Sequence, residues 1–298
     1  MRVEAEQVGR RFGRMVALSK VAFDLASGTR AALVGPNGAG KTTLARILLG
    51  MLECSGRVRL DGLSPTRDRS LVASKMAYVP QVAPGVAATA GELVRAVAAL
   101  RRIRVDEIVQ LADRFELDVS AIARKSFRAL SGGMKQKLLL AMALSAPVDL
   151  LILDEPTASL DVRGRGVLFQ MIEELPAQPT LILSSHRLEE IRRLVDQVIA
   201  LDDGELIYQG GVSSYLASAA ECVIEALPAN GDASALAALG FEPAAGGWWR
   251  RVVPQGEKIA TVERLLAAAA VTDLQVHEPE RLDPAASPPP HEEAHEDA

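Results

Sequence analysis

The chain has 298 residues, 49% of them apolar, and a formal net charge of −5, which predicts one large domain plus a small one and argues against nucleic acid as a partner. Cys54 and Cys222 are the only cysteines and lie far apart, which argues against a disulfide framework and favours a reducing compartment. The sequence has no signal peptide and no apolar run of about 20 residues, so we expect a cytoplasmic protein in which another chain supplies any membrane span.

The first 34 residues predict an antiparallel β region followed by a buried strand. Residues 3–8 and 16–25 alternate as strands do, and glycine and serine mark turns between and after them. Phe12 lies in the basic turn between these strands, where it is either a platform for stacking on adenine or a lone surface aromatic. Residues 31–34 form a short apolar run and predict the buried strand.

A phosphate-binding motif follows this strand directly. Residues 35–42 match G-x-x-x-x-G-K-[ST], and residues 43–49 predict the helix that the motif requires. Glycines let several backbone N–H groups and the helix N-terminus surround one anion, Lys41 would reach the β- and γ-phosphates, and the Thr42 hydroxyl would ligate Mg²⁺. The predicted nucleotide-binding residues of this segment are Gly35, Pro36, Asn37, Gly38, Ala39, Gly40, Lys41, Thr42 and Thr43.

The next stretch predicts strands at residues 56–61 and 75–79, and then a mainly helical insert over about residues 86–129. A segment Leu-Ser-Gly-Gly follows the insert and precedes a predicted helix over residues 138–146. Ser131 suits an N-cap, and Gly132 and Gly133 leave backbone N–H groups exposed. The segment is either a second anion-binding helix start or a glycine turn before a helix.

Two apolar runs predict buried parallel strands whose carboxyl ends carry polar side chains. Residues 150–155 end in Asp154 and Glu155, and residues 180–186 end in His186. Because ligands in open α/β sheets lie at these ends, Asp154 would meet the Mg²⁺ shell and Glu155 would orient or deprotonate water. His186 is either a sensor of the γ-phosphate or a structural histidine. A hairpin over residues 198–208 then leads to the end of the large domain near residue 218.

In this order, the motifs resemble those of the nucleotide-binding subunit of an ATP-binding cassette (ABC) transporter over about residues 1–218. The matching residues are Phe12 as the adenine-stacking aromatic, the phosphate loop 35–42, Gln81 as the Q-loop, residues 130–133 as the signature, Asp154 and Glu155, residues 159–161 as the D-loop, and His186 as the switch histidine. The chain departs from the family in using lysine after the signature, Ser159 in the D-loop and phenylalanine at position 12. These departures do not suggest an inactive site.

The resemblance implies an α/β P-loop ABC ATPase fold, with a mixed sheet, an antiparallel β subdomain and the helical insert. It implies ATP and Mg²⁺ as cofactors, with Thr42, Gln81 and Asp154 around the metal and with Glu155, His186 and Gln81 acting in hydrolysis. It also implies a head-to-tail homodimer, in which the Ser131-Gly132-Gly133 signature of one copy, next to the D-loop residue Asp161, closes over the ATP of the other copy. Hydrolysis would drive a separate polytopic permease at the inner face of the cell membrane.

The same resemblance favours ABC-2-like export. Residues 219–283 predict a small α+β domain similar to the tail of drug-, lipid- and copper-maturation-type ATPase subunits. Alternatives are an importer subunit, or a soluble ABC ATPase acting on ribosomes or DNA, although the chain has one cassette and no long coiled-coil insert. A P-loop kinase or switch GTPase is disfavoured because the signature and His186 are present and a guanine-reading Asn-Lys-x-Asp is absent.

The C-terminal region carries two features with open interpretations. Strands are expected at residues 221–227, 248–253 and 273–277, and helices at residues 232–239 and 257–269. The Trp248–Trp249 pair is either an interaction patch or partly packed. Residues 284–298 predict a disordered tail, in which His291 and His295 are either metal ligands or, as we favour, solvated side chains.

Overall fold

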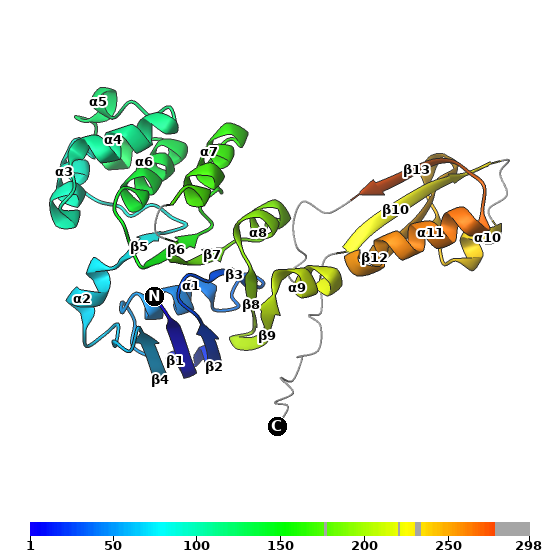
Figure 1. The fold of residues 1–298 in the computed structure, drawn as a ribbon, viewed down its shortest axis with the longest axis horizontal. Coiled ribbons are helices and arrows are strands. Elements are labelled where there is room, and N and C mark those ends of the chain that lie inside the picture. Colours follow the sequence, from blue (N-terminus) through cyan, green and yellow to red (C-terminus); the bar gives the residue numbers. More distant parts are fainter. Residues whose placement is uncertain (176–177, 220, 230–233, 278–298) are drawn as a thin grey trace.

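The structure is a computed structural model that describes residues 1–175, 178–219, 221–229 and 234–277 (Figure 1). The described strands form three sheets. Two sheets and the helices around them use residues up to 219, and the third sheet lies in a smaller lobe that uses residues 221–277. The architecture is α/β with a small α+β lobe, which confirms the expected fold class.

The central sheet has the strand order β5-β6-β7-β3-β8-β9. Its first five strands in that order are parallel, and β9 pairs antiparallel with β8. The strands are β3 (Arg30–Val34), β5 (Met76–Val79), β6 (Leu150–Asp154), β7 (Thr180–Ser184), β8 (Gln197–Asp202) and β9 (Glu205–Gly211). Every residue of β6 and of β7 is buried, as expected for parallel strands covered on both faces.

Two hydrophobic cores lie on the two faces of this sheet. Leu151 and Leu153 of β6 point into the core formed with α6 (Gly132–Leu144), α7 (Val162–Glu173), α8 (Leu188–Leu194) and α9 (Val212–Ala219). Leu150 and Ile152 point into the core formed with α1 (Lys41–Leu48) and the antiparallel sheet. Because neighbouring residues of a strand face opposite ways, the apolar run of β6 serves both cores. The predicted helix at residues 138–146 is this α6, which starts six residues earlier.

The antiparallel sheet has the strand order β2-β1-β4 and consists of β1 (Val3–Phe12), β2 (Met15–Leu25) and β4 (Ser55–Leu60). Its predicted strands are present, but the placement of Phe12 inside the turn was wrong. Phe12 is the last residue of β1 and pairs with Met15 across the hairpin. The turn is shorter than expected because Gly13 adopts a φ of 59°, which lets two residues reverse the chain.

The helical insert contains α3 (Ala90–Arg101), α4 (Val105–Arg114) and α5 (Val119–Ile122), which share a hydrophobic core with α6. Regular structure begins at Ala90 and not at residue 86. The reason is a capping box, in which Glu92 N donates to Thr89 Oγ1 at 3.2 Å and Thr89 N donates to Glu92 Oε2 at 2.7 Å. A further short helix, α2 (Arg69–Ser74), precedes β5 and was not predicted.

The smaller lobe packs helices on one face of a four-stranded antiparallel sheet in the order β11-β12-β10-β13. Its elements are β10 (Glu221–Pro228), α10 (Ser234–Ala238), β11 (Glu242–Pro243), β12 (Trp249–Pro254), α11 (Lys258–Ala268) and β13 (Val271–His277). The three longer strands and both helices agree with the sequence prediction. Trp249 packs against the core of this lobe, so at least one tryptophan of the pair is packed. His291 and His295 lie outside the described residues.

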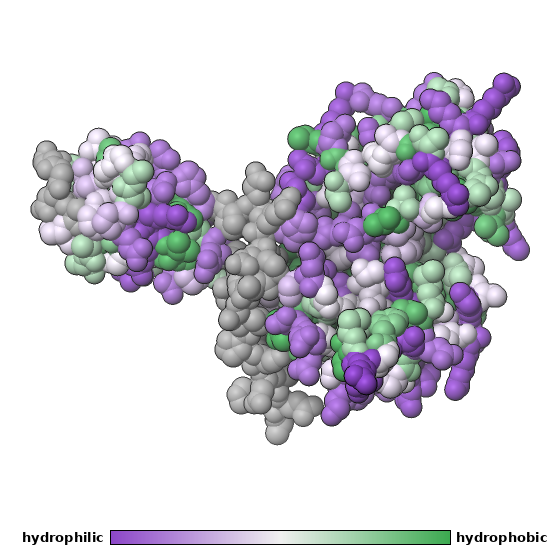
Figure 2. Space-filling model, turned by 180° about the vertical axis from the view of Figure 1, so that it is seen from behind, coloured by the Kyte–Doolittle hydropathy of each residue, from purple (hydrophilic) through white to green (hydrophobic). Residues whose placement is uncertain are grey.

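Most of the large apolar side chains of the described residues are buried, which leaves a mainly polar surface. Figure 2 shows one face of the larger lobe covered mainly by hydrophilic residues, with hydrophobic residues in scattered patches. Within the part of the chain that the structure describes, no helix combines the length and hydropathy needed to cross a bilayer.

The capping box of α3 can be tested by replacing Thr89 with alanine. The substitution removes the hydroxyl that accepts from Glu92 N, so it should destabilise the start of α3 by about 1 kcal/mol. Native-state hydrogen exchange measures this as faster exchange of the α3 amides, with the amides of α6 as the internal control. Unchanged exchange in α3 would show that the cap does not stabilise this helix.

Candidate functional site

The phosphate-binding loop connects β3 to α1 and depends on its glycines. Gly35, Gly38 and Gly40 have φ values of 141°, 92° and 100°, a region that residues with a Cβ rarely adopt. A Cβ on Gly35 would lie 2.1 Å from the carbonyl oxygen of Leu201. On Gly40 it would lie 2.6 Å from the carbonyl oxygen of Ala17. The loop is therefore pressed against β2 and β8, and its sequence is limited by both space and backbone conformation.

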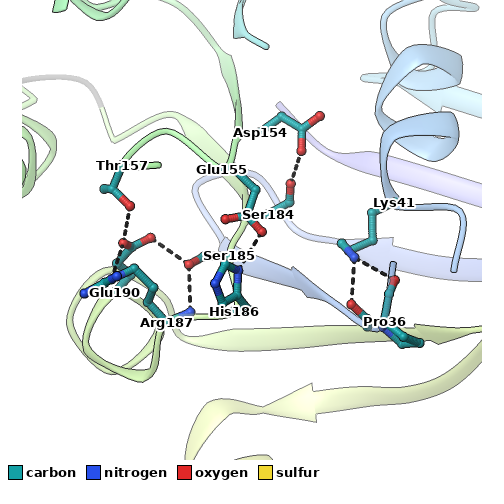
Figure 3. Close-up of polar contacts among 11 residues, drawn as sticks. Pro36, Lys41, Asp154, Glu155, Thr157, Ser184, Ser185, His186, Arg187 and Glu190 are labelled. Atoms are coloured by element: carbon teal, nitrogen blue, oxygen red, sulfur yellow. Dashed lines mark hydrogen bonds and ion pairs between the residues drawn. The ribbon is translucent and has the colours of Figure 1, made fainter. Parts of the chain in front are cut away.

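Lys41 is the first residue of α1, and its side chain folds back into this loop (Figure 3). Its Nζ donates to the carbonyl oxygens of Gly35, at 2.6 Å, and of Pro36, at 2.9 Å. Burial lowers the pKa of the Lys41 ammonium, whereas the negative charges of Glu155 and Asp154 raise it. A cation inside a loop of backbone N–H groups is suited to binding the phosphates of a nucleotide.

Asp154 ends β6 and is 3% exposed. Thr42 Oγ1 donates to its Oδ2 at 3.2 Å. Ser184 Oγ donates to its Oδ1 (Figure 3). Burial raises the pKa of the neighbouring Tyr78 to about 12, and the charge of Asp154 adds to this rise. The phenol therefore stays protonated beside the carboxylate. A carboxylate and a hydroxyl are the hard oxygen ligands that Mg²⁺ prefers, so these side chains fit a magnesium ion.

Glu155 and His186 lie side by side beyond the ends of β6 and β7. Glu155 Oε1 is 3.0 Å from His186 Nδ1 (Figure 3). The carboxylate is 13% exposed and the imidazole 41% exposed. The Glu155 backbone has a φ of 48°, and its N–H donates to the carbonyl oxygen of Ser184 at 2.9 Å. Two of the predicted site residues are thus in direct contact at the edge of the sheet that also carries the phosphate loop.

Other predicted site residues occupy different parts of the fold. Phe12 is 40% exposed at the tip of the β1–β2 hairpin, with the Arg10 guanidinium 4.9 Å from its ring centroid. Gln81 is exposed and follows β5. Asn37 is exposed at the loop tip, Ala39 is buried, and Thr43 is half-buried in the first turn of α1.

The signature and the D-loop adjoin one another. Ser131 caps α6 by accepting from Met134 N at 3.2 Å. Gly133 faces the D-loop, because a Cβ there would lie 3.0 Å from the Ser159 carbonyl oxygen. Asp161 caps α7 by accepting from Gly164 N at 2.6 Å, and Lys137 Nζ lies 3.8 Å from its Oδ2. None of these contacts reaches the phosphate loop of the same chain.

Comparisons with known proteins agree with this set of elements. The family model described as ABC transporter matches residues 18–158. The chain is 35% identical over 234 residues to the Nod factor export ATP-binding protein I of Paraburkholderia xenovorans (strain LB400), and the match covers 75% of each protein. This chain belongs to the ABC transporter family of ATP-binding proteins.

Two further matches support the ABC assignment. A daunorubicin resistance ATP-binding protein of Streptomyces coeruleorubidus is 34% identical, with 67% of this chain and 65% of that protein covered. A solved structure described as the ATP binding subunit of an ABC transporter has a TM-score of 0.65 at 25% identity, covering 72% of this chain and 92% of that one. As an ABC protein, the chain is an ATP-binding ATPase coupled to transport, which confirms the family and the activity expected from the motifs.

The ABC site contains buried residues that the sequence analysis missed. Ser184 holds Asp154, Gln136 Nε2 donates to the Pro156 carbonyl oxygen at 2.9 Å, and Glu190 of α8 binds the hydroxyls of Thr157 and Ser185. The pair of serines at the end of an apolar strand was a visible signal. Gln136 and Glu190 had none, because both lie in ordinary helical sequence.

Replacing Gly35 with alanine should disrupt the phosphate loop. The new Cβ would overlap the Leu201 carbonyl and the φ of 141° would be strained, so we expect a loss of about 1–3 kcal/mol in stability together with weaker ATP binding. Gly166→Ala is the matched control, since no atom lies within 4 Å of its added Cβ. Thermal unfolding and titration with a fluorescent ATP analogue measure the two effects. Equal behaviour of the two variants would contradict this account of the loop.

Proposed function

We propose that this chain is the ATP-hydrolysing subunit of an ABC exporter whose membrane-spanning part is a separate polytopic permease. The observation that carries the proposal is the meeting of Lys41, Asp154 and the Glu155–His186 pair at one edge of the central sheet. The relatives named for Nod factor export and daunorubicin resistance support export as its direction. ABC-2-like export is favoured over import for this reason.

In this proposal, residues 35–43 bind the ATP phosphates, and Phe12 stacks on the adenine. The loop N–H groups and Lys41 offset the phosphate charge. Thr42, Asp154 and Gln81 would hold Mg²⁺ through oxygen atoms. Held there, the ion would supply positive charge opposite the phosphates. Ser184 keeps the Asp154 carboxylate turned toward Thr42, because it donates to the other carboxylate oxygen.

Glu155 is the proposed general base or water-positioning residue. Its carboxylate is mostly buried and touches His186, so it has a defined orientation. It would accept a proton from water, or align that water. His186 would hydrogen-bond the γ-phosphate while it contacts the Glu155 carboxylate, and so keep the two groups in a fixed relative position. A positioned base contributes typically about 10²–10⁴ in rate.

Two copies packed head to tail would complete each nucleotide site. The start of α6 supports this arrangement, because Ser131 and Gly132 are exposed and the first turn of the helix carries no acidic residue. A helix of 13 residues with an open N-terminus attracts an anion. The contacts given above for the start of α6 are with the helix itself and with the D-loop, and none is with the phosphate loop of the same chain. We therefore propose the ATP of a second copy as the anion, with Asp161 of the D-loop next to it.

The surface around Gln81 is the proposed contact with the permease. Gln81 is exposed beside Val82, whose side chain is 78% exposed, between β5 and the helical insert. A residue at this position could transmit a change at the metal site to the helical insert. The chain would then work at the inner face of the cell membrane as a peripheral subunit.

The role of Glu155 is tested by replacing it with glutamine. The amide keeps the size of the side chain but cannot accept a proton, so turnover should fall about 10²–10⁴-fold while ATP still binds. Lys41→Ala should instead weaken ATP binding, because it removes the cation inside the loop. The exposed Glu205 provides the control Glu205→Gln, which should resemble the wild type. Near-normal turnover of Glu155→Gln would refute the assignment.

The transporter role is tested by purifying the Glu155→Gln variant in mild detergent with Mg-ATP, after expression together with the proteins encoded next to it. We expect a complex of a polytopic membrane protein with two copies of this chain, because ATP that is not hydrolysed keeps the two copies together. The mass of the purified complex measures this composition. Recovery as an ATP-bound dimer without the membrane protein would favour the alternative of a soluble ABC ATPase that acts on ribosomes or DNA.

A further inference from the structure

A buried acid lies next to the Glu155–His186 pair. Glu190, in the first turn of α8, is 1% exposed. Its Oε1 accepts from Thr157 Oγ1, and its Oε2 accepts from Ser185 Oγ at 2.7 Å (Figure 3). Arg187 Nε lies 3.4 Å from Oε1 as an ion pair without hydrogen-bond geometry. Both carboxylate oxygens are therefore held by groups from outside α8.

The two hydroxyls come from the two loops that carry the proposed reacting groups. Thr157 follows Glu155 by two residues in the loop after β6, and Ser185 directly precedes His186 after β7. Ser185 Oγ also accepts from the backbone N of Arg187 at 3.0 Å, so its proton is directed at Glu190. One carboxylate thus connects both loops next to the Glu155–His186 contact.

Burying this carboxylate is costly, which argues that it has a defined task. Burial raises the pKa of Glu190 and the charge of Glu155 adds to the rise, whereas the two hydroxyls and Arg187 lower it. A buried polar group with satisfied partners fixes a specific arrangement more than it adds stability. Nearby, the left-handed φ of 48° at Glu155 is a conformation that persists only when surrounding contacts hold it.

We propose that Glu190 is a positioning residue for ATP hydrolysis, which fixes Glu155 relative to His186 by holding the hydroxyls of Thr157 and Ser185. This inference rests on the proposed roles of Glu155 and His186. Glu190 itself touches neither of these two side chains through a hydrogen bond. It acts through the backbones of the two loops, and displacement of a reacting group by about 1 Å is enough to cost about 10²-fold in rate.

The first test compares Glu190→Gln with Glu189→Gln in the full-length protein. Both substitutions remove one negative charge from α8, but Glu189 is exposed. Glu190→Gln should lower kcat about 10–100-fold with less than about a twofold change in the Kd of a fluorescent ATP analogue, and Glu189→Gln should change neither. Wild-type kcat in Glu190→Gln, or a loss of ATP affinity as large as the loss of kcat, would overturn the proposal.

The second test leaves Glu190 in place and removes its donors. Thr157→Val and Ser185→Ala should each lower kcat, and the double variant should approach Glu190→Gln, because all three changes break the same connection. Wild-type kcat in both single variants would contradict the proposal that these two hydrogen bonds position Glu155. These variants also decide the question if Glu190→Gln fails to fold.

The third test measures single-turnover hydrolysis in a Glu155→Gln background. Adding Glu190→Gln there should cause no further loss, since the group to be positioned is gone, whereas a general structural defect would add its own loss. If Glu155→Gln retains normal turnover, the proposed function of that residue fails. If Glu155→Gln loses turnover and Glu190→Gln does not, only the positioning role of Glu190 is wrong.

Discussion

The register between two parallel strands is the constraint on which the site depends. β6 and β7 pair so that Asp154 lies opposite Ser184, and the hydroxyl of Ser184 binds the carboxylate. A slip of one residue would turn each side chain to the other face of the sheet. Glu155 and His186 follow these two residues in the chain, so their contact follows from the same register. Burial of both strands in two cores makes such a slip costly.

The phosphate loop has its own constraint, which comes from close approach of backbones. Gly40 lies against Ala17 and Leu18 of β2, and Gly35 lies against Leu201 of β8. The turn between β8 and β9 also contacts β2, because Ser19 N of β2 donates to the Gly204 carbonyl oxygen at 2.8 Å. The antiparallel sheet is therefore part of the wall that shapes the loop. The β region that precedes the motif therefore supports the loop in addition to carrying Phe12.

Residues with a local pattern could be predicted from the sequence, and residues whose role depends on distant contacts could not. The glycines of residues 35–40 and the acids at the end of β6 follow from spacing and hydrophobicity. The contact of Glu155 with His186 could be expected from two adjacent strand ends. Glu190 could not, because an acid in a seven-residue helix is normally solvated, and only the fold buries it. The start of α3 was misplaced although Thr89 and Glu92 form a visible capping pattern.

Charge explains how the parts of the site act together. Burial lowers the pKa of the Lys41 ammonium, whereas the negative charges of Glu155 and Asp154 act in the opposite direction, so both carboxylates lie close to this cation. These two carboxylates would repel the phosphates of ATP unless cations intervene. Lys41 supplies one positive charge and the α1 N-terminus a partial one, which leaves a deficit that a divalent metal ion can fill. The same excess of negative charge would favour separation of the phosphates after hydrolysis, and in the proposed head-to-tail dimer this repulsion would promote opening.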